Sequence, residues 1–331
     1  MGSSSESFPA PSAEVLAVFR TLADTSGAMT FEQFMTVALY HPEVGYYRQS
    51  RPRVGRGKGT DFFTATTSGT IFGELVSSAC TKLLRASGRN PASHTFVEVG
   101  AEPGGFGVLT NVAHPFAGTE VRRIGDPLAL RGECVIFSNE LFDAQPCRRT
   151  VYRNGTWRTV GVRIKEDRLE ETELDMLNEQ SPWPGTEGYR FDQPVAAATL
   201  SDQIAAEPWT GIFVAIDYGK TFRALVEETP AGTLRAYYRH SQSNDVLARP
   251  GEQDLTCHIC WDWIEASLRQ RGFSNPTLEF QEAFFIRHAG DFLATVSARD
   301  AAQFSPRKQA LLQLLHPSHM GQKFQVLHAI R

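Results

Sequence analysis

Residues 96–107, FVEVGAEPGGFG, decide the fold class of this chain. The first five residues are apolar except for Glu98 and predict a buried strand, and positions 100–107 hold four glycines. Glycine allows the backbone to turn sharply and to approach a ligand without a Cβ clash. The spacing GxxxGGxG differs from the GxGxxG fingerprint of dinucleotide-binding folds. The segment predicts a strand and a tight turn. The turn either binds a nucleotide-type ligand or has only a structural role.

Other segments have the same strand character. Residues 133–139 and 211–219 are nearly continuous apolar runs, and residues 120–125 form a shorter strand. Continuous apolar runs are typical of parallel strands covered on both faces. The strands end in Gly, Asn or Asp, and in open α/β sheets such strand ends border the ligand crevice. We therefore predict an α/β protein with a mixed sheet, in which strand-like segments at 281–290 and 323–331 add antiparallel strands.

Helical periodicity marks the region before the first strand. Apolar residues recur at helical spacing over 13–23, 30–40 and 68–84. Thr30 and Gln33 have the spacing of a capping box, which predicts that the second helix begins there.

The sequence predicts three parts. Residues 1–12 are small and polar and are expected to be a disordered tail, and 13–95 form an N-terminal helical segment that contributes to the site. Residues 96–331 form the core. An insertion at about 150–210 interrupts this core and starts as a hairpin with an Asn154-Gly155 turn.

Composition excludes several classes of function. The chain has 331 residues, a net charge of −4 and 41% hydrophobic residues, so no basic field favours nucleic acid or an acidic lipid surface. No apolar run approaches the 18 residues of a membrane-spanning helix. The five scattered cysteines fit reduced thiols better than a disulfide framework. With no secretory or mitochondrial signal visible at the start, a cytoplasmic location is expected.

Glu98, inside the first strand, indicates the type of ligand. A carboxylate at this position would be repelled by a pyrophosphate, but it could accept hydrogen bonds from an ammonium group or a ribose hydroxyl. This favours S-adenosylmethionine, which has a free amino acid end and no phosphate, over NAD or ATP. The absence of GxSxG and Walker A patterns argues against hydrolases and NTPases.

Together with further motifs, these residues resemble the MidA-like family of class I S-adenosylmethionine-dependent methyltransferases. The mitochondrial members of this family are similar to protein arginine methyltransferases that assist the assembly of respiratory complex I. The resemblance extends from about Met29 to the C-terminus and implies a Rossmann-like methyltransferase core. Besides FVEVGAEPGG (96–105), it rests on MTFEQFMTVALYHPEVGYY (29–47), GTDFFTATTSGTIFGEL (59–75), VIFSNELFDAQP (135–146), IDYG (216–219), PGEQDLTCHI (250–259) and HPSHMGQKFQVL (316–327).

The resemblance implies roles for individual residues. Positions of the cofactor loop are matched by Glu98, Gly100, Gly104 and Gly105, and Asp126 is expected among the cofactor-binding residues. Positions after the fourth core strand, which face the methyl group, are matched by Asn139, Glu140 and Asp143. A lid, a wall or other substrate contacts are implied for Asp61, Glu74, Asp217, Asp254 and His258.

The segment 108–132 departs from the family pattern. Only 25 residues separate Gly107 from Glu133, whereas one βαβ unit alone takes ~30 residues. The segment accommodates one strand, so either Glu120 or Asp126 must replace the ribose-binding acid of a complete core. This shortening supports an alternative, a degenerate methyltransferase fold that acts as a non-catalytic binding or assembly factor.

The chemistry expected at Glu140 and Asp143 is the binding of a guanidinium group. Arginine has a pKa above ~12 and needs carboxylates to hold and orient it. The alternative is that Glu140 caps the next segment and Asp143 is solvated. Asp217 either lines the crevice or accepts backbone hydrogen bonds in its turn. His258 is either functional, as in the family motif, or a structural histidine.

No metal site is predicted. Cys257 and Cys260 form a single CxxC without a second pair, and His316 and His319 lack acidic neighbours. The leading hypothesis is therefore an S-adenosylmethionine-dependent protein arginine N-methyltransferase that acts on a protein substrate, with a homodimer left open. An NAD-dependent enzyme is disfavoured because GxGxxG is absent.

Overall fold

The computed structural model describes residues 10–49, 53, 60–61, 69–102, 105–176, 185–299 and 305–331. The chain forms two compact units, each assembled from three stretches of sequence. Unit 1 comprises Met1–Phe62, Ala144–Ala197 and Lys220–Cys260. Unit 2 comprises Phe63–Asp143, Ala198–Gly219 and Trp261–Arg331.

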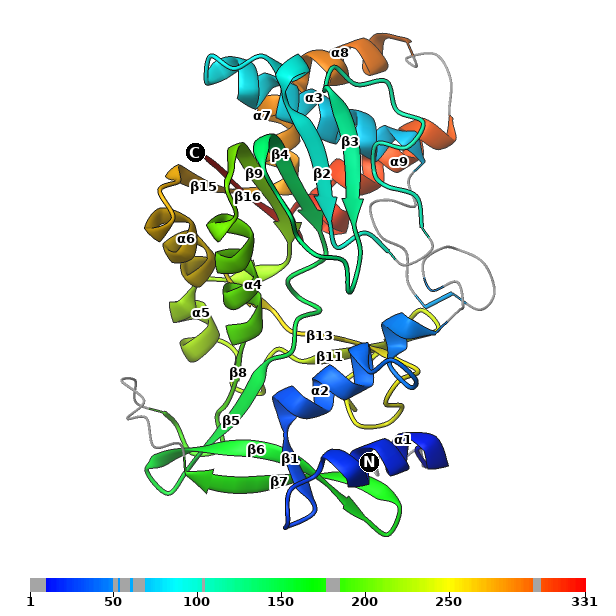
Figure 1. Cartoon of the computed structure of the whole chain (residues 1–331), viewed down its shortest axis with the longest axis vertical. Helices are drawn as coiled ribbons and strands as arrows, with labels where there is room; N and C mark the ends of the chain where they lie inside the picture. The colour runs from blue at the N-terminus through cyan, green and yellow to red at the C-terminus, as the bar shows by residue number, and fades with distance from the viewer. Residues whose placement is uncertain are drawn as a thin grey trace. The chain divides into compact units, whose positions relative to one another are not determined.

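Unit 2 contains a six-stranded mixed sheet with the order β15-β16-β9-β4-β2-β3 (Figure 1). Strands β3, β2, β4 and β9 are parallel, and β16 is antiparallel to both β9 and β15. The predicted α/β fold with a mixed sheet is thus confirmed. The strands are β2 (Thr95–Val99), β3 (Gly118–Arg122), β4 (Gly132–Asn139), β9 (Trp209–Asp217), β15 (Ser274–Phe280) and β16 (Gln325–Ile330).

Helices cover both faces of this sheet (Figure 1). One face packs against α3, α7, α8 and α9 in a continuous apolar core, which includes Phe96, Phe137 and Val326 from the strands. The other face is covered by α4 and α6. These helices are α3 (Thr70–Ala86), α4 (Val195–Ala206), α6 (Trp261–Gln270), α7 (Gln281–His288), α8 (Gly290–Arg299) and α9 (Pro306–Leu315), with short turns η3 (Pro91–Ser93) and η4 (Pro317–Gly321).

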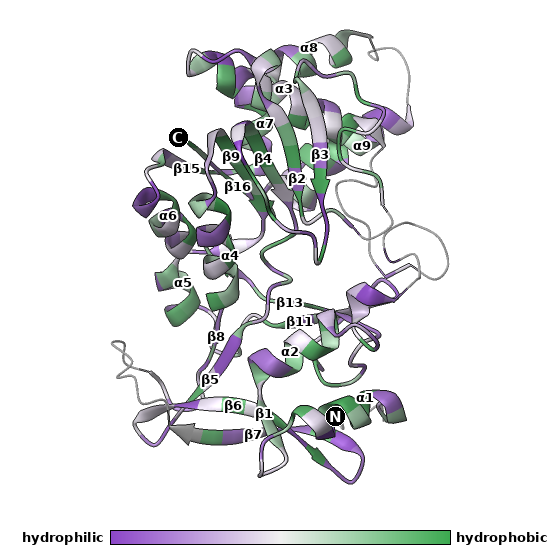
Figure 2. Ribbon diagram, in the orientation of Figure 1, coloured by the Kyte–Doolittle hydropathy of each residue, from purple (hydrophilic) through white to green (hydrophobic). Residues whose placement is uncertain are grey.

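Strand β3 is the exposed edge of the sheet. Its residues are half-buried or exposed, whereas β4 is buried from Cys134 to Ser138 and β9 is almost fully buried. Figure 2 shows the same contrast, because β4 and β9 are mostly hydrophobic and β3 is not. Among the described residues between β2 and β4, β3 is the only strand and no helix occurs. The predicted shortening of this region is confirmed.

Unit 1 is built on antiparallel sheets that surround a helical core. In its larger sheet, β1, β6, β5 and β8 are neighbours in that order, and β7 pairs with β6. A three-stranded sheet has the order β12-β11-β13, and β10 (Gly219–Lys220) pairs with β14. The remaining strands are β1 (Ala28–Thr30), β5 (Arg148–Arg153), β6 (Thr156–Lys165), β7 (Arg168–Met176), β8 (Arg190–Gln193), β11 (Arg235–Tyr238), β12 (Ser241–Ser243), β13 (Asp254–Thr256) and β14 (Ile259–Cys260).

The helices of unit 1 pack on these sheets through aromatic and aliphatic side chains, among them Phe31 and Phe34. The predicted capping box is confirmed, because Thr30 Oγ1 accepts from the Gln33 N–H and Gln33 Oε1 accepts from the Thr30 N–H. The helices are α1 (Ala13–Leu22), α2 (Phe31–Tyr40), α5 (Phe222–Glu227) and the short η1 (Tyr46–Arg48).

Two local predictions are tested by this architecture. The hairpin at 150–165 is confirmed as β5 and β6, with Asn154 and Gly155 both at positive φ (51° and 80°) as a tight primed turn requires. The expected strand at 281–290 is wrong, because α7 occupies most of that range and the strand, β15, precedes it. Phe284 and Phe285 of α7 are buried. Glu282 in the first turn and Arg287 in the last turn interact favourably with the helix dipole.

After the hairpin, the predicted insertion continues with β7, β8 and α4. All five cysteines are buried free thiols, as expected for reduced cysteines. No helix in the described part of the chain is long and apolar enough to cross a membrane.

Candidate active site

Glu98 is a buried carboxylate near the carboxyl end of β2. Its Oε2 accepts a hydrogen bond from the Val108 N–H at 2.6 Å. Burial raises the pKa of Glu98 to about 7, against the lowering effects of this hydrogen bond and of the charge on Arg123. Among the described residues, no arginine or lysine forms an ion pair with this carboxylate. Glu98 can therefore accept a cation or a hydrogen-bond donor.

Two glycines shape the turn that follows β2. Gly100 has a φ of 85°, and a Cβ there would lie 2.4 Å from Leu141 Cδ1. This position requires glycine both for its backbone conformation and for the close approach of the segment after β4. The Gly105 N–H donates to the Glu102 carbonyl at 2.9 Å, and the Gly105 carbonyl accepts from Arg123 Nη2 at 2.9 Å.

The segment after β4 carries the predicted catalytic residues. Glu140 has a φ of 51°, which is strained for a non-glycine residue, and its N–H donates to the Ile216 carbonyl at 2.9 Å. Asn139 Nδ2 donates to Glu140 Oε1 at 3.0 Å. Asn139 Oδ1 is buried and accepts no hydrogen bond within the described residues. Asp143 is buried, with 2% of its surface exposed. Backbone strain at Glu140 is typical of a functional site.

Asp217 ends β9, the strand next to β4. Its Oδ2 accepts from the backbone N–H groups of Phe142 (2.9 Å) and Asp143 (3.3 Å), and its Oδ1 accepts from that of Tyr218 (2.9 Å). Burial raises the pKa of Asp217 to about 7, and the charge of nearby Glu140 acts in the same direction. Asp217 therefore fixes the segment after β4 and also contributes negative charge beside Glu140.

The structure thus gathers several predicted residues of unit 2 at the carboxyl ends of the adjacent parallel strands β2, β4 and β9. Gly100 meets the segment after β4, and Asp217 binds its backbone. In parallel α/β sheets this edge is where ligands bind. Asp217 accepts backbone hydrogen bonds in its turn, which was one of its two predicted roles. Its place at the end of β9 is also compatible with the other role, lining the crevice.

Asp126 lies in an exposed turn beyond β3. Its Oδ2 accepts from the Arg123 N–H at 2.8 Å, and its own N–H donates to the Arg123 carbonyl at 3.0 Å. Glu120 is exposed on β3 and forms an ion pair with Arg122. Asp126 thus stabilises its own turn, and its predicted contact with a ribose stays a prediction.

Glu74 lies on α3, where it forms an ion pair with Arg307 of α9 and accepts from Thr70 Oγ1 at 2.9 Å. It also lines a surface hollow between α3 and α8. These contacts give it a structural role, and its predicted place in a lid stays a prediction.

The other predicted residues belong to unit 1. Asp61 is fully buried and accepts from Tyr46 Oη (2.8 Å) and the Arg239 N–H (3.0 Å). Asp254 is buried and accepts from Tyr47 Oη at 2.9 Å. Both acids thus have well-defined partners within unit 1.

His258 also lies in unit 1. Its N–H donates to Thr233 Oγ1 at 3.2 Å. Burial, aided by the charges of Lys220 and Arg235, lowers the pKa of His258 to about 4. Its imidazole is neutral at pH 7, which suits a structural histidine.

Gly104 lies outside the described residues. Sequence reasoning missed Arg123, which links the end of β3 to the glycine turn through Gly105 and lowers the pKa of Glu98. The signal was present in the sequence as the basic pair Arg122-Arg123. The family pattern predicts an acid in this region, so the basic pair was not considered as part of the site.

Comparisons with known proteins show what this chain is similar to. A family described as "Putative S-adenosyl-L-methionine-dependent methyltransferase" matches residues 119–276, just under half of the chain. A crystal structure from Burkholderia thailandensis, bound to S-adenosyl-homocysteine, has a TM-score of 0.84 at 24% identity and covers 98% of this chain and 95% of its own. A native structure from the same organism has a TM-score of 0.81 at 23% identity with the same coverage. Among curated proteins, no relative matches this chain.

The chain is thus similar over residues 119–276 to a family of putative S-adenosylmethionine-dependent methyltransferases, and it shares its fold with the two solved structures. The MidA-like resemblance predicted from the sequence agrees with these matches, and the cofactor in the family's description is the predicted one. The rival prediction of an NAD-dependent enzyme gains no support.

The described residues suit this cofactor. The buried Glu98 carboxylate can hold the ammonium of the methionine end, and Gly100 allows the backbone to turn beside it. Buried Asn139 Oδ1 and Ser138 Oγ have no hydrogen-bond partner within the described residues, so two polar atoms at the end of β4 can serve a ligand.

Proposed function

We propose that this chain transfers a methyl group from S-adenosylmethionine to an arginine side chain of a protein. The observation that carries the proposal is the concentration of acids at the ends of three adjacent parallel strands: buried Glu98 near the end of β2, half-buried Glu140 after β4 and buried Asp217 at the end of β9. An arginine substrate is a permanent cation, and carboxylates are the groups that hold and orient it.

The acids divide into two groups by their surroundings. Glu98 lies beside the glycine turn and serves the cofactor, which when bound supplies an electrophilic methyl group on a sulfonium sulfur. Glu140 lies between Asn139, which donates to it, and the negative charge of Asp217. A guanidinium bound at Glu140 would offset the mutual repulsion of Glu140 and Asp217, so this pair favours a cationic acceptor over a neutral one.

Methyl transfer requires few groups besides these. The reaction is an in-line displacement, so the protein mainly aligns the acceptor nitrogen with the methyl group and accepts a proton as the bond forms. Glu140 is the residue to orient the guanidinium, and Asp143 follows it within the same segment. Because Asp217 accepts from the Asp143 N–H, it holds that segment in place.

The test uses the purified chain with tritiated S-adenosylmethionine and protein extracts as acceptors. Hydrolysis of the labelled protein followed by amino acid analysis identifies the methylated residue. Label in methylarginine supports the proposal. Label confined to methyllysine or another residue refutes the arginine specificity, while leaving methyltransferase activity intact.

A non-catalytic binding or assembly factor is the second candidate, and the short region between β2 and β4 favours it. The edge strand β3 ends at Arg122, so the strand next to β2 ends in a base rather than an acid. Calorimetry separates the two candidates. Saturable heat with S-adenosylmethionine at micromolar concentration supports the enzyme, and no heat at millimolar concentration supports the scaffold.

A further inference from the structure

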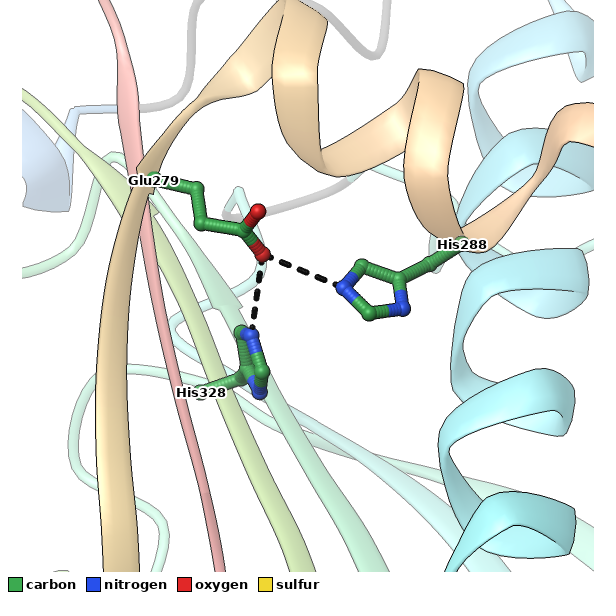
Figure 3. Close-up of side chains that lie close together, drawn as sticks. All are labelled: Glu279, His288 and His328. Atoms are coloured by element: carbon green, nitrogen blue, oxygen red, sulfur yellow. Dashed lines mark hydrogen bonds and ion pairs between the residues drawn. The ribbon is translucent and has the colours of Figure 1, made fainter.

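A second cluster of titratable side chains lies in unit 2, on the sheet face covered by α3 and α7. Glu279 of β15, His288 of α7 and His328 of β16 point toward one another (Figure 3). Each histidine Nε2 lies 3.1 Å from the same oxygen, Glu279 Oε2. The side chains are 6%, 14% and 12% exposed, respectively, so the cluster is largely shielded from water.

The fold accounts for this convergence. In the antiparallel pair β15–β16, Glu279 is opposite Val326 and Thr277 is opposite His328. Glu279 and His328 are therefore diagonal neighbours on one face of the sheet. Helix α7 begins directly after β15 and runs back over that face, and its last residue, His288, completes the cluster. Residues 279, 288 and 328 thus meet although they come from three elements.

We propose that Glu279, His288 and His328 form a zinc-binding site. Two imidazole nitrogens and one carboxylate oxygen are a common set of three protein ligands for zinc. With metal–ligand distances of ~2.1 Å, tetrahedral ligand atoms are roughly 3.4 Å apart. The three ligand atoms here all lie within 4.8 Å of one another, so only small side-chain movements are needed.

The surroundings of the cluster suit a metal ligand set. Arg287 Nη1 forms an ion pair with the other oxygen of Glu279, Oε1, which leaves Oε2 directed toward the histidines. Outer partners of this kind orient ligating carboxylates. The neutral imidazole is the form that coordinates metal. On binding, each ring keeps one proton, on Nδ1 in place of Nε2.

The site has a route to solvent. His288 also lines the hollow between α3 and α8, which has a volume of about 650 Å³ and is bordered by Glu74, Ser77, Thr81, Lys82 and Asp291. A metal ion can enter from this side, and a water molecule from the hollow can supply the fourth ligand. The bound ion would tie α7 to β15 and β16, the antiparallel edge of the sheet.

This inference differs from the sequence prediction of no metal. The sequence offers no compact pattern, since the three residues are separated by 9 and 40 positions. Candidate metal ligands were sought among residues that are close in sequence, namely Cys257 with Cys260 and His316 with His319. Strand register and a helix of eight residues create the cluster, and neither is visible as a motif.

The test uses the full-length untagged chain after removal of metal with EDTA. Zn²⁺ is added in competition with a chromophoric chelator, and bound zinc is counted by elemental analysis. We expect one ion per chain, and binding at least ~100-fold weaker in the double variant His288→Gln/His328→Gln, because removal of ligands should exceed the 10–100-fold effect of losing an outer partner. Arg287→Ala should weaken binding by about 10-fold or more.

The matched control is His316→Gln/His319→Gln, which removes two histidines of unit 2 outside the cluster and should bind zinc normally. Circular dichroism shows whether each variant folds. If His328→Gln does not fold, the single variant His288→Gln at the helix end takes its place. In addition, Co²⁺ bound at this site should show the strong visible absorption of tetrahedral cobalt. No stoichiometric binding by the wild-type chain, or equal weakening in both double variants, would overturn the proposal.

Discussion

Buried carboxylates occur in both units, and their partners differ. In unit 1, Asp192 accepts from the backbone N–H groups of Thr233 and Leu234 and forms an ion pair with buried Arg149, whose Nε lies 3.4 Å from Asp192 Oδ1. In unit 2, Glu98 and Asp217 accept hydrogen bonds from backbone N–H groups. Within the described residues, neither of these two forms an ion pair with an arginine or lysine.

The difference separates acids that complete the fold from acids that are available for a ligand. A buried charge is stable when it is paired, and Asp192 has its cation within the protein. For Glu98 and Asp217, burial outweighs the backbone hydrogen bonds and raises each pKa to about 7. A cation from outside, such as an ammonium or a guanidinium, would supply the missing charge. Perturbed acids at the ends of parallel strands therefore indicate the active site better than burial alone.

The largest expected effect is at Glu140. Glu140→Gln keeps the shape of the side chain but removes the charge that, in the proposed function, orients and deprotonates the guanidinium. Methyl transfer should fall by ~10²–10⁴-fold, the usual range for a positioned acid or base. Affinity for S-adenosylmethionine should change little, because Glu98 and the glycine turn hold the cofactor. Single-turnover methylation and calorimetry measure the two quantities separately.

Glu133→Gln is the control for this experiment, because Glu133 is an exposed acid of the same unit near the amino end of β4, opposite the end that leads to Glu140. It should leave both quantities unchanged. Unaltered methylation by Glu140→Gln would remove Glu140 from the catalytic role.

Arg149→Met tests the paired acid of unit 1. The substitution leaves Asp192 buried without its cation, which should lower the free energy of unfolding by about 3–5 kcal/mol. Urea unfolding at neutral pH measures the change. The double variant Arg149→Met/Asp192→Asn should recover part of the loss, since it removes the stranded charge. A loss below about 1 kcal/mol would mean that Asp192, like Glu98 and Asp217, does not depend on a cation within the protein.

The pH dependence of stability tests Glu98. Its pKa in the folded chain, about 7, lies above the ordinary value of 4.5, so the folded state binds the proton more tightly than the unfolded state. The resulting stabilisation is complete below pH 4.5 and is lost as the pH rises through 7. Glu98→Gln should flatten this decline and stabilise the chain at pH 8 by about 1–3 kcal/mol, since each pKa unit is worth about 1.4 kcal/mol.

Denaturation midpoints from pH 4 to pH 8 give the comparison between Glu98→Gln and the wild-type chain. Saturating S-adenosylmethionine should flatten the wild-type curve as well, because its ammonium favours the ionised carboxylate. Parallel curves for the two proteins would show that Glu98 is not a perturbed acid.

The sequence predicted the parallel strands well because their cause is local. Residues 96–100, 133–139 and 211–219 are apolar throughout, and continuous apolar runs form strands that are covered on both faces. The segment 281–290 was misjudged because its paired aromatic residues suit a strand as well as a helix. Packing of Phe284 and Phe285 into the core with α3 decides in favour of the helix, and that contact is not local.

The candidate site was predictable to a similar extent. Glu98, Glu140 and Asp217 lie at or near the carboxyl ends of strands that could be recognised, so their position at one edge followed from the topology of parallel sheets. The meeting of Glu279 with His288 and His328 depends on the register between β15 and β16 and on where α7 ends. The ion pair of Glu74 with Arg307 likewise joins residues far apart in the chain.

The smallest expected effect is at Asp61 of unit 1, where a tyrosine hydroxyl contributes to the stability of the acid. Tyr46→Phe removes the hydrogen bond from Tyr46 Oη to Asp61 Oδ2, while the Arg239 N–H still donates to Oδ1. The free energy of unfolding should fall by about 1–2 kcal/mol, within the range for a hydrogen bond to a charged group and below the loss at Arg149. Tyr237→Phe is the matched control, because the bond from its hydroxyl to Gln242 is exposed, and it should change stability by less than about 0.5 kcal/mol. If Tyr46→Phe is no worse than this control, Asp61 does not depend on the tyrosine.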